Sequence, residues 1–363
     1  MPDERKTALV ILGAGASYDI VPTLRDDPNR FSTPVVDDLR PVLAEDIFTD
    51  SRPVREALAA YPDVDQLSST IRASSKGLED YLLELSRSTA PFRQRGIKEM
   101  PLYLRHLFTS LSKFTTDPIN YKALVQRLFD NSGFDQITIV SLNYDLLLDR
   151  VLELADFGGA FDSMEAYDRP DVHPHLLYVK LHGSIDWAWR LSGSDPSQVR
   201  EIVATPSHQA TVRAYRDLIH RATEWPPAGL GDPVIVGPGD HFEGDAPLYP
   251  ALAIPTGEYK FICPDGQVDK LREFLPTCSN VLVIGCSARD QRFLDFLNSH
   301  LHIVLNFVLV DFGMQPTAEL RERLLEHVPT LGLSQQHNFQ LYDKGFSGFL
   351  RRGGLDEFID AAR

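Results

Sequence analysis

The sequence predicts an α/β protein whose core is a Rossmann-like, mainly parallel, doubly wound sheet, with a helical insertion or layer added to it. Two observations support this fold class. Short apolar runs rich in β-branched residues alternate with segments that place apolar side chains at helical spacing. Several of these runs end in glycine, asparagine or histidine, and doubly wound sheets bind their ligands at the carboxyl ends of the strands.

Six apolar runs are expected to be the strands, since such runs are typical of parallel strands buried on both faces. They are residues 7–12, 136–142, 176–181, 280–284, 303–310 and 339–342. The clearest helix is residues 77–88, where Leu78, Tyr81, Leu82 and Leu85 share one helix face. The other expected helices are residues 35–47, 54–60, 102–114, 121–129, 211–222, 290–298, 317–327 and 355–361, with a further one after Asn143.

Residues 1–363 are expected to form a single domain with two insertions. A helical insertion at about residues 35–130 separates the first strand from the second. Residues from about 190 to 265 are rich in proline and glycine, and are expected to be irregular apart from one helix and some short strands. Residues 18–33 are polar and contain proline, so we expect a flexible loop near the ligand.

Composition excludes several classes of partner. The formal net charge is −15 and the pI about 5.1. Non-specific binding to nucleic acid or to an anionic membrane needs a basic face, so we expect no direct nucleic-acid or membrane binding. No run approaches the roughly 18–20 apolar residues of a membrane span. A phosphorylated small ligand stays compatible with this charge, because backbone N–H groups at a helix N-terminus bind phosphate locally.

The cysteines indicate a reducing compartment. The chain has three cysteines, Cys263, Cys278 and Cys286, and no two of them form a C-x-x-C pair. A disulfide framework and a structural zinc site are therefore both unexpected, and no metal site is predicted. We expect a cytoplasmic protein.

The first candidate motif is Leu-Gly-Ala-Gly-Ala-Ser at residues 12–17, directly after the first strand. The third glycine of a G-x-G-x-x-G fingerprint is replaced here by Tyr18. Two interpretations stay open. Gly13 and Gly15 could only permit close packing, or the turn could cradle a pyrophosphate with N–H groups of Ala14, Gly15, Ala16 and Ser17.

The second motif is Ser-Leu-Asn-Tyr-Asp at residues 141–145, at the end of the second main strand. Asparagine and aspartate are preferred helix N-caps, and one of the two could be only that. In the functional interpretation, the Asn143 carboxamide binds the ribose hydroxyls or an attacking water. Asp145 would then hold a loop or a hydroxyl in place.

His182, in Lys-Leu-His-Gly-Ser, follows the third strand and could be an ordinary loop residue. Histidine is nevertheless the side chain best suited to accept a proton near neutral pH. Asn143 and His182 lie 39 positions apart at the ends of successive strands, so we expect them to be close in space. Gly285, Ser287 and Asp311 end later strands. They could be only turn residues. Alternatively, Ser287 could lie near the second phosphate or ribose, and Asp311 could accept from the adenosine ribose hydroxyls.

The ordered set Gly-Ala-Gly-Ala-Ser, Leu-Asn-Tyr-Asp, Lys-Leu-His-Gly-Ser and Ile-Gly-Cys-Ser resembles the sirtuin superfamily, and looks most like the bacterial sirtuin-like effectors of anti-phage defence. The similarity spans residue 8 to about 312 and is dense only at these motifs. It implies that Asn143 and His182 are the catalytic pair, with Asp145 in the same motif. It also implies that residues 13–17 bind NAD, with Gly285, Ser287 and Asp311 as late dinucleotide contacts.

The sequence departs from the family's protein deacylases in two places. Those enzymes carry two C-x-x-C pairs that bind zinc after the His-Gly motif, and this chain has neither. The loop after Ser17 reads Tyr-Asp-Ile-Val-Pro-Thr-Leu in place of the family's Gly-Ile-Pro-Asp-Phe-Arg. Both departures count against a peptide substrate.

We therefore expect an NAD+ glycohydrolase that gives ADP-ribose and nicotinamide, with NAD as its substrate and no zinc. An NAD-dependent protein deacylase and a non-catalytic NAD- or ADP-ribose-binding subunit are the alternatives. Because an enzyme that drains NAD is toxic unless restrained, a homo-oligomer or a regulatory partner is expected. The resemblance suggests a hexameric translocase-type ATPase or an Argonaute-like protein as that partner.

Overall fold

The computed structural model describes most of the chain. The described residues are 6–20, 41–43, 46–73, 78–113, 117–130, 133–157, 161, 163–168, 175–191, 195–205, 207–222, 231–254 and 260–362. The expected helix at residues 35–47 and the expected loop at residues 18–33 lie largely outside them.

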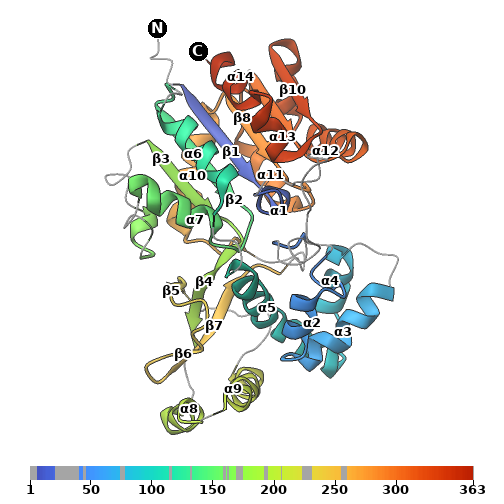
Figure 1. Ribbon diagram of the computed structural model, residues 1–363, viewed down its shortest axis with the longest axis vertical. Coiled ribbons are helices and arrows are strands. Elements are labelled where there is room, and N and C mark those ends of the chain that lie inside the picture. Colours follow the sequence, from blue (N-terminus) through green and yellow to red (C-terminus); the bar gives the residue numbers. More distant parts are fainter. Residues whose placement is uncertain are drawn as a thin grey trace, which may run out of the picture.

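The main sheet has six parallel strands in the order β10-β9-β8-β1-β2-β3 (Figure 1). Their bounds are β1 (Thr7–Leu12), β2 (Gln136–Ser141), β3 (Leu176–Lys180), β8 (Asn280–Ile284), β9 (Asn306–Val310) and β10 (Asn338–Tyr342). The chain winds outward from β1 to β3, and then returns to the other side of β1 at β8. This is the Rossmann order, and its switch point lies between β1 and β8. The expected fold class is confirmed.

The main-sheet strands form at the predicted apolar runs, and all of them except β10 are buried along nearly their whole length. All six residues of β1 and all five of β8 are buried. The exception to the predicted positions is β9, which begins at Asn306 and not at residue 303, since Ile303 and Leu305 are exposed and lie outside the ladder.

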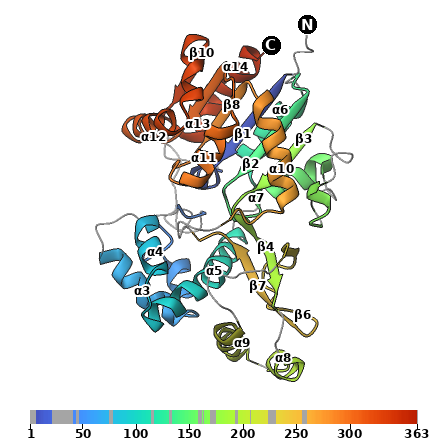
Figure 2. The same cartoon turned by 180° about the vertical axis from the view of Figure 1, so that it is seen from behind.

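Helices cover both faces of this sheet (Figures 1 and 2). On one face lie α6 (Ile119–Asp130), α13 (Gly345–Arg351) and α14 (Gly354–Ala361), with α7 (Leu147–Leu152) packed beside α6. On the other lie α10 (Asp265–Phe274), α11 (Gln291–His300) and α12 (Met314–His327). The expected helices at 121–129, 290–298, 317–327 and 355–361 are present, whereas α10 and α13 were not expected. The short elements are α1 (Ala14–Tyr18), a π-helix at Glu153–Phe157 and 3₁₀ turns at Ala166–Asp168, Leu275–Thr277 and Pro329–Gln336.

A second layer with its own core lies beyond the carboxyl ends of β2 and β3 (Figure 1). It contains an antiparallel sheet of order β5-β4-β7-β6, with β4 (Gly183–Arg190), β5 (Val234–Ile235), β6 (Phe242–Glu243) and β7 (Ala246–Leu252). Its helices are α2 (Arg52–Leu58), α3 (Pro62–Ala73), α4 (Leu78–Ser86), α5 (Pro91–Ser112), α8 (Pro196–Val203) and α9 (His208–Ala222).

The second layer corrects two expectations. The helix expected at residues 102–114 starts at Pro91 and runs through Pro101, because Tyr103, Leu104 and Leu107 are buried on its inner side. The described parts of residues 190–265 contain α8 in addition to the one expected helix, α9, and both helices pack on β7. Among the described residues, no helix is both long and apolar enough to cross a membrane.

Candidate functional site

The glycine turn after β1 packs directly on the turn after β8, at the switch point of the sheet. The Gly13 N–H donates to the Ile284 carbonyl at 3.0 Å, and the Gly15 N–H donates to the Gly285 carbonyl at 2.9 Å. A Cβ at Gly13 would lie 2.5 Å from the Gly285 oxygen, and a Cβ at Gly285 would lie 2.2 Å from the Ala16 nitrogen. The backbones of the two turns approach so closely that only glycine fits at these positions, which supports the packing interpretation of the motif.

The same turn has few N–H groups left for a phosphate. Of the four predicted donors, Gly15 bonds to Gly285, and Ala16 donates to the Gly13 carbonyl at 2.9 Å. Ala14 is half-buried at the start of α1, whereas Ser17 is buried. A ligand phosphate here would depend on the remaining donors and on the positive end of α1.

Asn143 ties the second motif to the first. Its Nδ2 donates to the Gly13 carbonyl at 2.9 Å and to the Ser17 hydroxyl at 3.0 Å, with the Tyr121 hydroxyl at 3.4 Å. These partners fix which end of the carboxamide is nitrogen, because a carbonyl oxygen can only accept. No described residue donates to Oδ1. Asn143 thus offers an acceptor oxygen and keeps its donors inside the protein.

Asp145 belongs to the same buried network. Its Oδ1 accepts from the Leu147 N–H at 3.0 Å, which is the helix-capping role considered from the sequence. Burial raises the pKa of the Asp145 carboxyl, although the Leu147 N–H, the Ser17 hydroxyl and the Lys180 charge oppose this shift. Burial also raises the pKa of the neighbouring Tyr121. Asp145 therefore holds the end of β2 in place and does not reach into open space.

Lys180 compensates the carboxylates at the end of β3. Its side chain is fully buried, and Nζ donates to the Asp145 carbonyl, the Asp149 carboxylate and the Ser184 hydroxyl at 2.9, 2.8 and 2.7 Å. All three ammonium donors are therefore satisfied. This arrangement fixes the Lys-Leu-His-Gly-Ser segment against the Asn-Tyr-Asp segment.

His182 lies beside Asn143, as the sequence predicted. Its Nδ1 is 3.2 Å from the carbonyl of Leu142, the residue that precedes Asn143, and its Nε2 is 2.7 Å from the Asp290 carboxylate. The next residue, Gly183, has φ +80°, and a Cβ there would lie 1.9 Å from the Ala251 carbonyl oxygen. Glycine is required at this point because the chain leaves the main sheet for the second one.

The two partners of His182 define the protonation states open to it. A carbonyl and a carboxylate both only accept, so both ring nitrogens must carry hydrogen when both bonds are made. A neutral ring makes only one of these bonds: hydrogen on Nδ1 keeps the Leu142 bond, and hydrogen on Nε2 keeps the Asp290 bond. When both bonds are made the ring is an imidazolium, and Asp290 stabilises its charge.

Asp290 and Tyr121 are site residues that sequence reasoning missed. Asp290 was placed only at the start of a helix, and it does cap α11 by accepting from the Phe293 N–H at 3.1 Å. Its position six residues after β8, at the carboxyl side of the sheet, was the available signal. Tyr121 had none, because it looks like any apolar residue of α6.

The late motif residues lie at the expected strand ends. Gly285 follows β8 and has φ +58°, and Ala288 has φ +48°, which is strained for a residue with a Cβ. Ser287 is exposed, and its carbonyl accepts from Arg323 at 2.5 Å. Asp311 follows β9, and its N–H donates to the Tyr342 carbonyl at 2.9 Å. Among the described residues, no hydrogen bond or ion pair joins Ser287 to Asn143 or His182.

One cluster in the second layer has the composition of a metal site. Potential ligand atoms of Asp63, Glu99 and His220 lie within 4.8 Å of one another. The Glu99 Oε1, however, accepts from Arg216 at 2.6 Å and lies 3.0 Å from His220 Nε2. A guanidinium in contact with the central carboxylate disfavours a cation there, and the cluster is best described as an ion-pair network between α3, α5 and α9.

Comparison with known proteins places this site in a family. The model of the SIR2-like domain matches residues 137–325, just over half of the chain, and this span includes Asn143, His182 and Asp290. A solved chain described as "Structural Basis for the Mechanism and Regulation of Sir2 Enzymes" is 12% identical. That alignment covers 99% of this chain and 92% of the other, with a TM-score of 0.36. No curated protein matches the chain.

Proposed function

Because the chain belongs to the SIR2-like domain family, which indicates NAD-dependent activity, we propose that it is an NAD+ glycohydrolase. The enzyme would cleave the bond between nicotinamide and ribose and release nicotinamide and ADP-ribose. The observation that carries the proposal is that His182, after β3, lies against the segment after β2 that carries Asn143. The imidazole is bonded to the carbonyl next to Asn143, at 3.2 Å.

The chemistry needs a positioned acceptor and a base. As the bond breaks, the ribose carbon gains positive character and a water attacks it, so one proton must leave that water. Asn143 Oδ1 accepts a hydrogen bond from a ribose hydroxyl or from the water, since its Nδ2 is already bonded to Gly13 and Ser17. Neutral His182 accepts the proton at whichever ring nitrogen carries no hydrogen, and Asp290, whose carboxylate lies 2.7 Å from Nε2, stabilises the imidazolium.

The remaining sequence motifs supply binding. NAD would lie across the switch point between β1 and β8, where Gly13, Gly15 and Gly285 bring two turns together. The positive end of α1 would face a phosphate, with Ala14 and Ser17 beside it. Ser287 and Asp311 would contact the distal part of the dinucleotide, as the family resemblance suggests.

The cysteines favour hydrolysis over deacylation. The chain contains no C-x-x-C pair, and Cys263, Cys278 and Cys286 are all buried. Burial raises the pKa of the Cys278 thiol to about 12. A protein that retains the asparagine and histidine without the zinc module is suited to destroying NAD, and not to transferring an acyl group to it.

The biological role that fits this activity is anti-phage defence by abortive infection in the cytoplasm. This part of the proposal is supported by the resemblance to sirtuin-like defence effectors. Constant NAD depletion would kill the host cell, so the activity would be restrained by homo-oligomerisation or by a partner such as a translocase-type ATPase or an Argonaute-like protein.

The test is product analysis with purified protein. NAD+ is incubated with the chain, with and without candidate partners, and with and without an acetyl-lysine peptide. The proposal expects equal amounts of nicotinamide and ADP-ribose in the absence of peptide. Nicotinamide release that depends on the peptide and gives 2′-O-acetyl-ADP-ribose would show a deacylase, and NAD binding without any turnover would show a non-catalytic subunit.

A further inference from the structure

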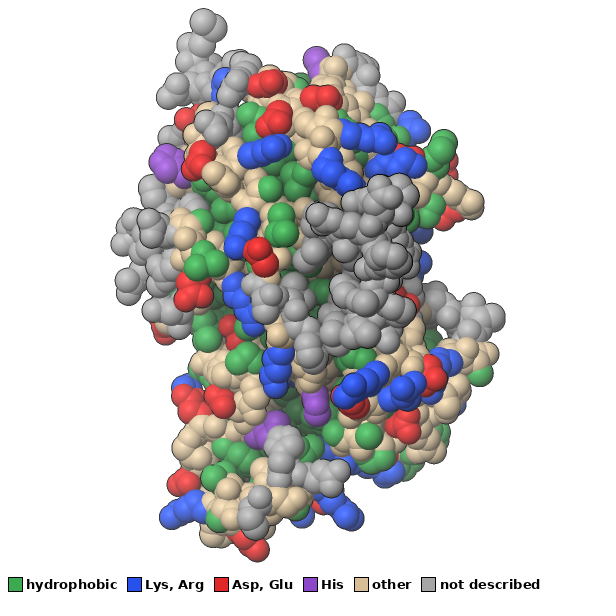
Figure 3. All heavy atoms as spheres, viewed as in Figure 1, with side chains coloured by type: hydrophobic (Ala, Val, Ile, Leu, Met, Phe, Trp, Pro, Cys, Tyr) green, Lys and Arg blue, Asp and Glu red, His purple; other side chains and the backbone are tan. Residues whose placement is uncertain are grey.

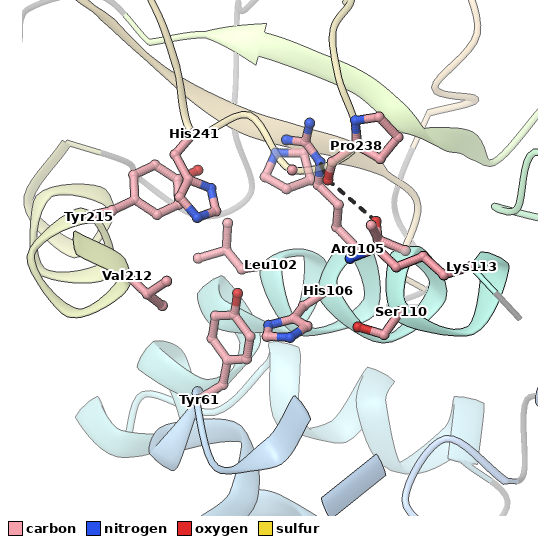
Figure 4. Close-up of a pocket in the computed structure, with 13 residues that line it drawn as sticks. Tyr61, Leu102, Arg105, His106, Ser110, Lys113, Val212, Tyr215, Pro238 and His241 are labelled. Carbon is pink, nitrogen blue, oxygen red and sulfur yellow. Dashed lines mark hydrogen bonds between the residues drawn. The ribbon is translucent and has the colours of Figure 1, made fainter. Parts of the chain in front are cut away.

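A pocket lies in the layer below the main sheet, between α5, α9 and the loop that follows β5 (Figure 4). Its volume is about 140 Å³. In Figure 4 the rings of Tyr215 and His241 face each other on one side, and Tyr61 and His106 lie together below them. The pocket is separate from the switch point, because none of its lining residues belongs to β1, β8 or the turns that follow them.

The lining carries basic groups and no acidic one among the described residues. Arg105, Lys113, His106 and His241 all line it, and the Ser110 hydroxyl adds a donor, whereas the Thr109 hydroxyl donates to the Pro238 carbonyl at 3.3 Å. This is unusual in a chain whose formal charge is −15. On the face shown in Figure 3, histidine side chains gather with lysine and arginine side chains over the region where α5 and α9 lie.

Arg105 provides the independent indication of a ligand. It is 4% exposed, and Nε and Nη2 donate to the carbonyls of Pro238 and Gly237 at 2.9 and 2.5 Å. Nη1 is buried, and no described residue accepts a hydrogen bond from it. A buried guanidinium nitrogen without a hydrogen-bond acceptor destabilises the protein unless a bound anion accepts from it.

The protein's own carboxylates compensate this charge only in part. Asp240 and Asp186 act on Arg105 electrostatically, and burial of the guanidinium still lowers its pKa. Asp240 is exposed and accepts from the Gly237 N–H at 2.8 Å. Burial raises the pKa of Asp186, although the Lys180 charge opposes this shift. Glu99, on the same helix as Arg105, is bonded to Arg216.

We propose that this pocket binds a small ligand bearing a phosphate group, with Arg105 as the anchor. A phosphate offers several acceptor oxygens and a double charge, which suits the unused Nη1 of Arg105, the nearby Lys113 ammonium and the Ser110 hydroxyl. The volume is close to that of a cavity of about 150 Å³ that holds benzene. It is smaller than the roughly 300–1,000 Å³ of drug-sized sites, so the pocket takes a phosphate or small phosphomonoester and excludes a dinucleotide.

The experiment measures phosphate binding to the full chain without NAD, so its outcome is independent of the proposed hydrolase activity. Inorganic phosphate and ribose 5-phosphate are titrated by calorimetry at constant ionic strength, with sodium chloride as the reference salt. We expect saturable binding at one site per chain. Binding by ribose 5-phosphate would identify an organic phosphate as the ligand class, and binding by inorganic phosphate alone would identify the free ion.

Variants locate the binding. Lys113→Met removes an exposed charge at the end of α5 and should weaken phosphate binding about tenfold. Arg105→Lys keeps the charge, loses the Nη1 donor and should weaken binding at least as much. Lys122→Met, an exposed lysine on α6 outside the pocket, is the matched control and should bind like the wild type. Absence of saturable binding by the wild type, or equal affinities in all four proteins, would overturn the proposal.

Discussion

Substitution of Gly285 by alanine should be the most damaging single-methyl change at the switch point. Gly285 has φ +58°, and the added Cβ would lie 2.2 Å from the Ala16 nitrogen and 2.4 Å from the Gly15 carbonyl carbon. Both are backbone atoms, so no flexible side chain can move aside. The turn after β1 and the turn after β8 would have to separate.

The expected free-energy cost has two parts. A left-handed backbone costs a non-glycine residue about 1–2 kcal/mol. Overpacking a rigid contact adds about 1–3 kcal/mol. Gly285→Ala should therefore lower the free energy of unfolding by about 2–5 kcal/mol. Gly133→Ala is the matched control, because Gly133 has φ +67° and a Cβ there would meet nothing within 4 Å. It should cost only the first part.

The assay is urea unfolding followed by circular dichroism, combined with calorimetric titration of NAD. Gly285→Ala should be less stable than Gly133→Ala by about 1–3 kcal/mol and should bind NAD more weakly. Gly133→Ala should bind NAD like the wild type, since Gly133 lies before β2 at the opposite end of the sheet. Equal losses of stability in the two variants would refute the reasoning from close backbone approach.

Three further predictions concern the charged groups. Asp290→Asn should slow nicotinamide release about 10–100-fold in initial-rate assays, with circular dichroism unchanged, because the imidazolium loses its counter-charge; an unaltered rate would exclude that role. The pKa of the Asp145 carboxyl is raised in the folded protein, so the wild type loses stability as the pH rises above about 3.8, where the unfolded carboxyl ionises first. Asp145→Asn lacks this carboxyl, and its stability relative to the wild type should therefore increase over the same pH range. Thermal melts across this range that run parallel for the two proteins would contradict it. Lys180→Met should lower the free energy of unfolding by about 3–5 kcal/mol, because it leaves the Asp149 carboxylate without its ammonium partner. Asp356→Asn, which breaks an exposed ion pair, is the control. A smaller change of the urea midpoint in Lys180→Met than in Asp356→Asn would contradict the prediction.

Strand positions in the main sheet were predictable because their signal is local. A run such as Thr7–Leu12 is apolar at every position, and burial on both faces is the only arrangement that removes all of it from water. The strand-end positions of Asn143 and His182 followed from the same runs.

The second sheet was not predictable for the opposite reason. Strand β7 contains Pro247 and Pro250, which normally argue against an interior strand, yet it lies between β4 and β6. Its pairing with β4 shifts register between Gly183 and Ala188, so no regular alternation marks either strand. These pairings depend on contacts between segments about 60 residues apart in the chain, which a local pattern does not record.

The candidate site shows the same division. Asn143 and His182 were visible because each follows a strand, whereas Asp290 lies 108 positions from His182 and resembles an ordinary helix cap. That Asn143 uses its Nδ2 within the protein depends on Gly13, 130 positions away. Residue types and strand ends thus identify the catalytic candidates, while their partners come from tertiary contacts.

The most direct test of the central claim compares wild-type protein with His182→Ala in NAD+ hydrolysis, under the conditions that give the highest wild-type rate. General-base catalysis typically contributes about 10²–10⁴-fold, so nicotinamide release should fall by that factor while circular dichroism and NAD binding show a folded protein. Nicotinamide release by His182→Ala at the wild-type rate would contradict the account.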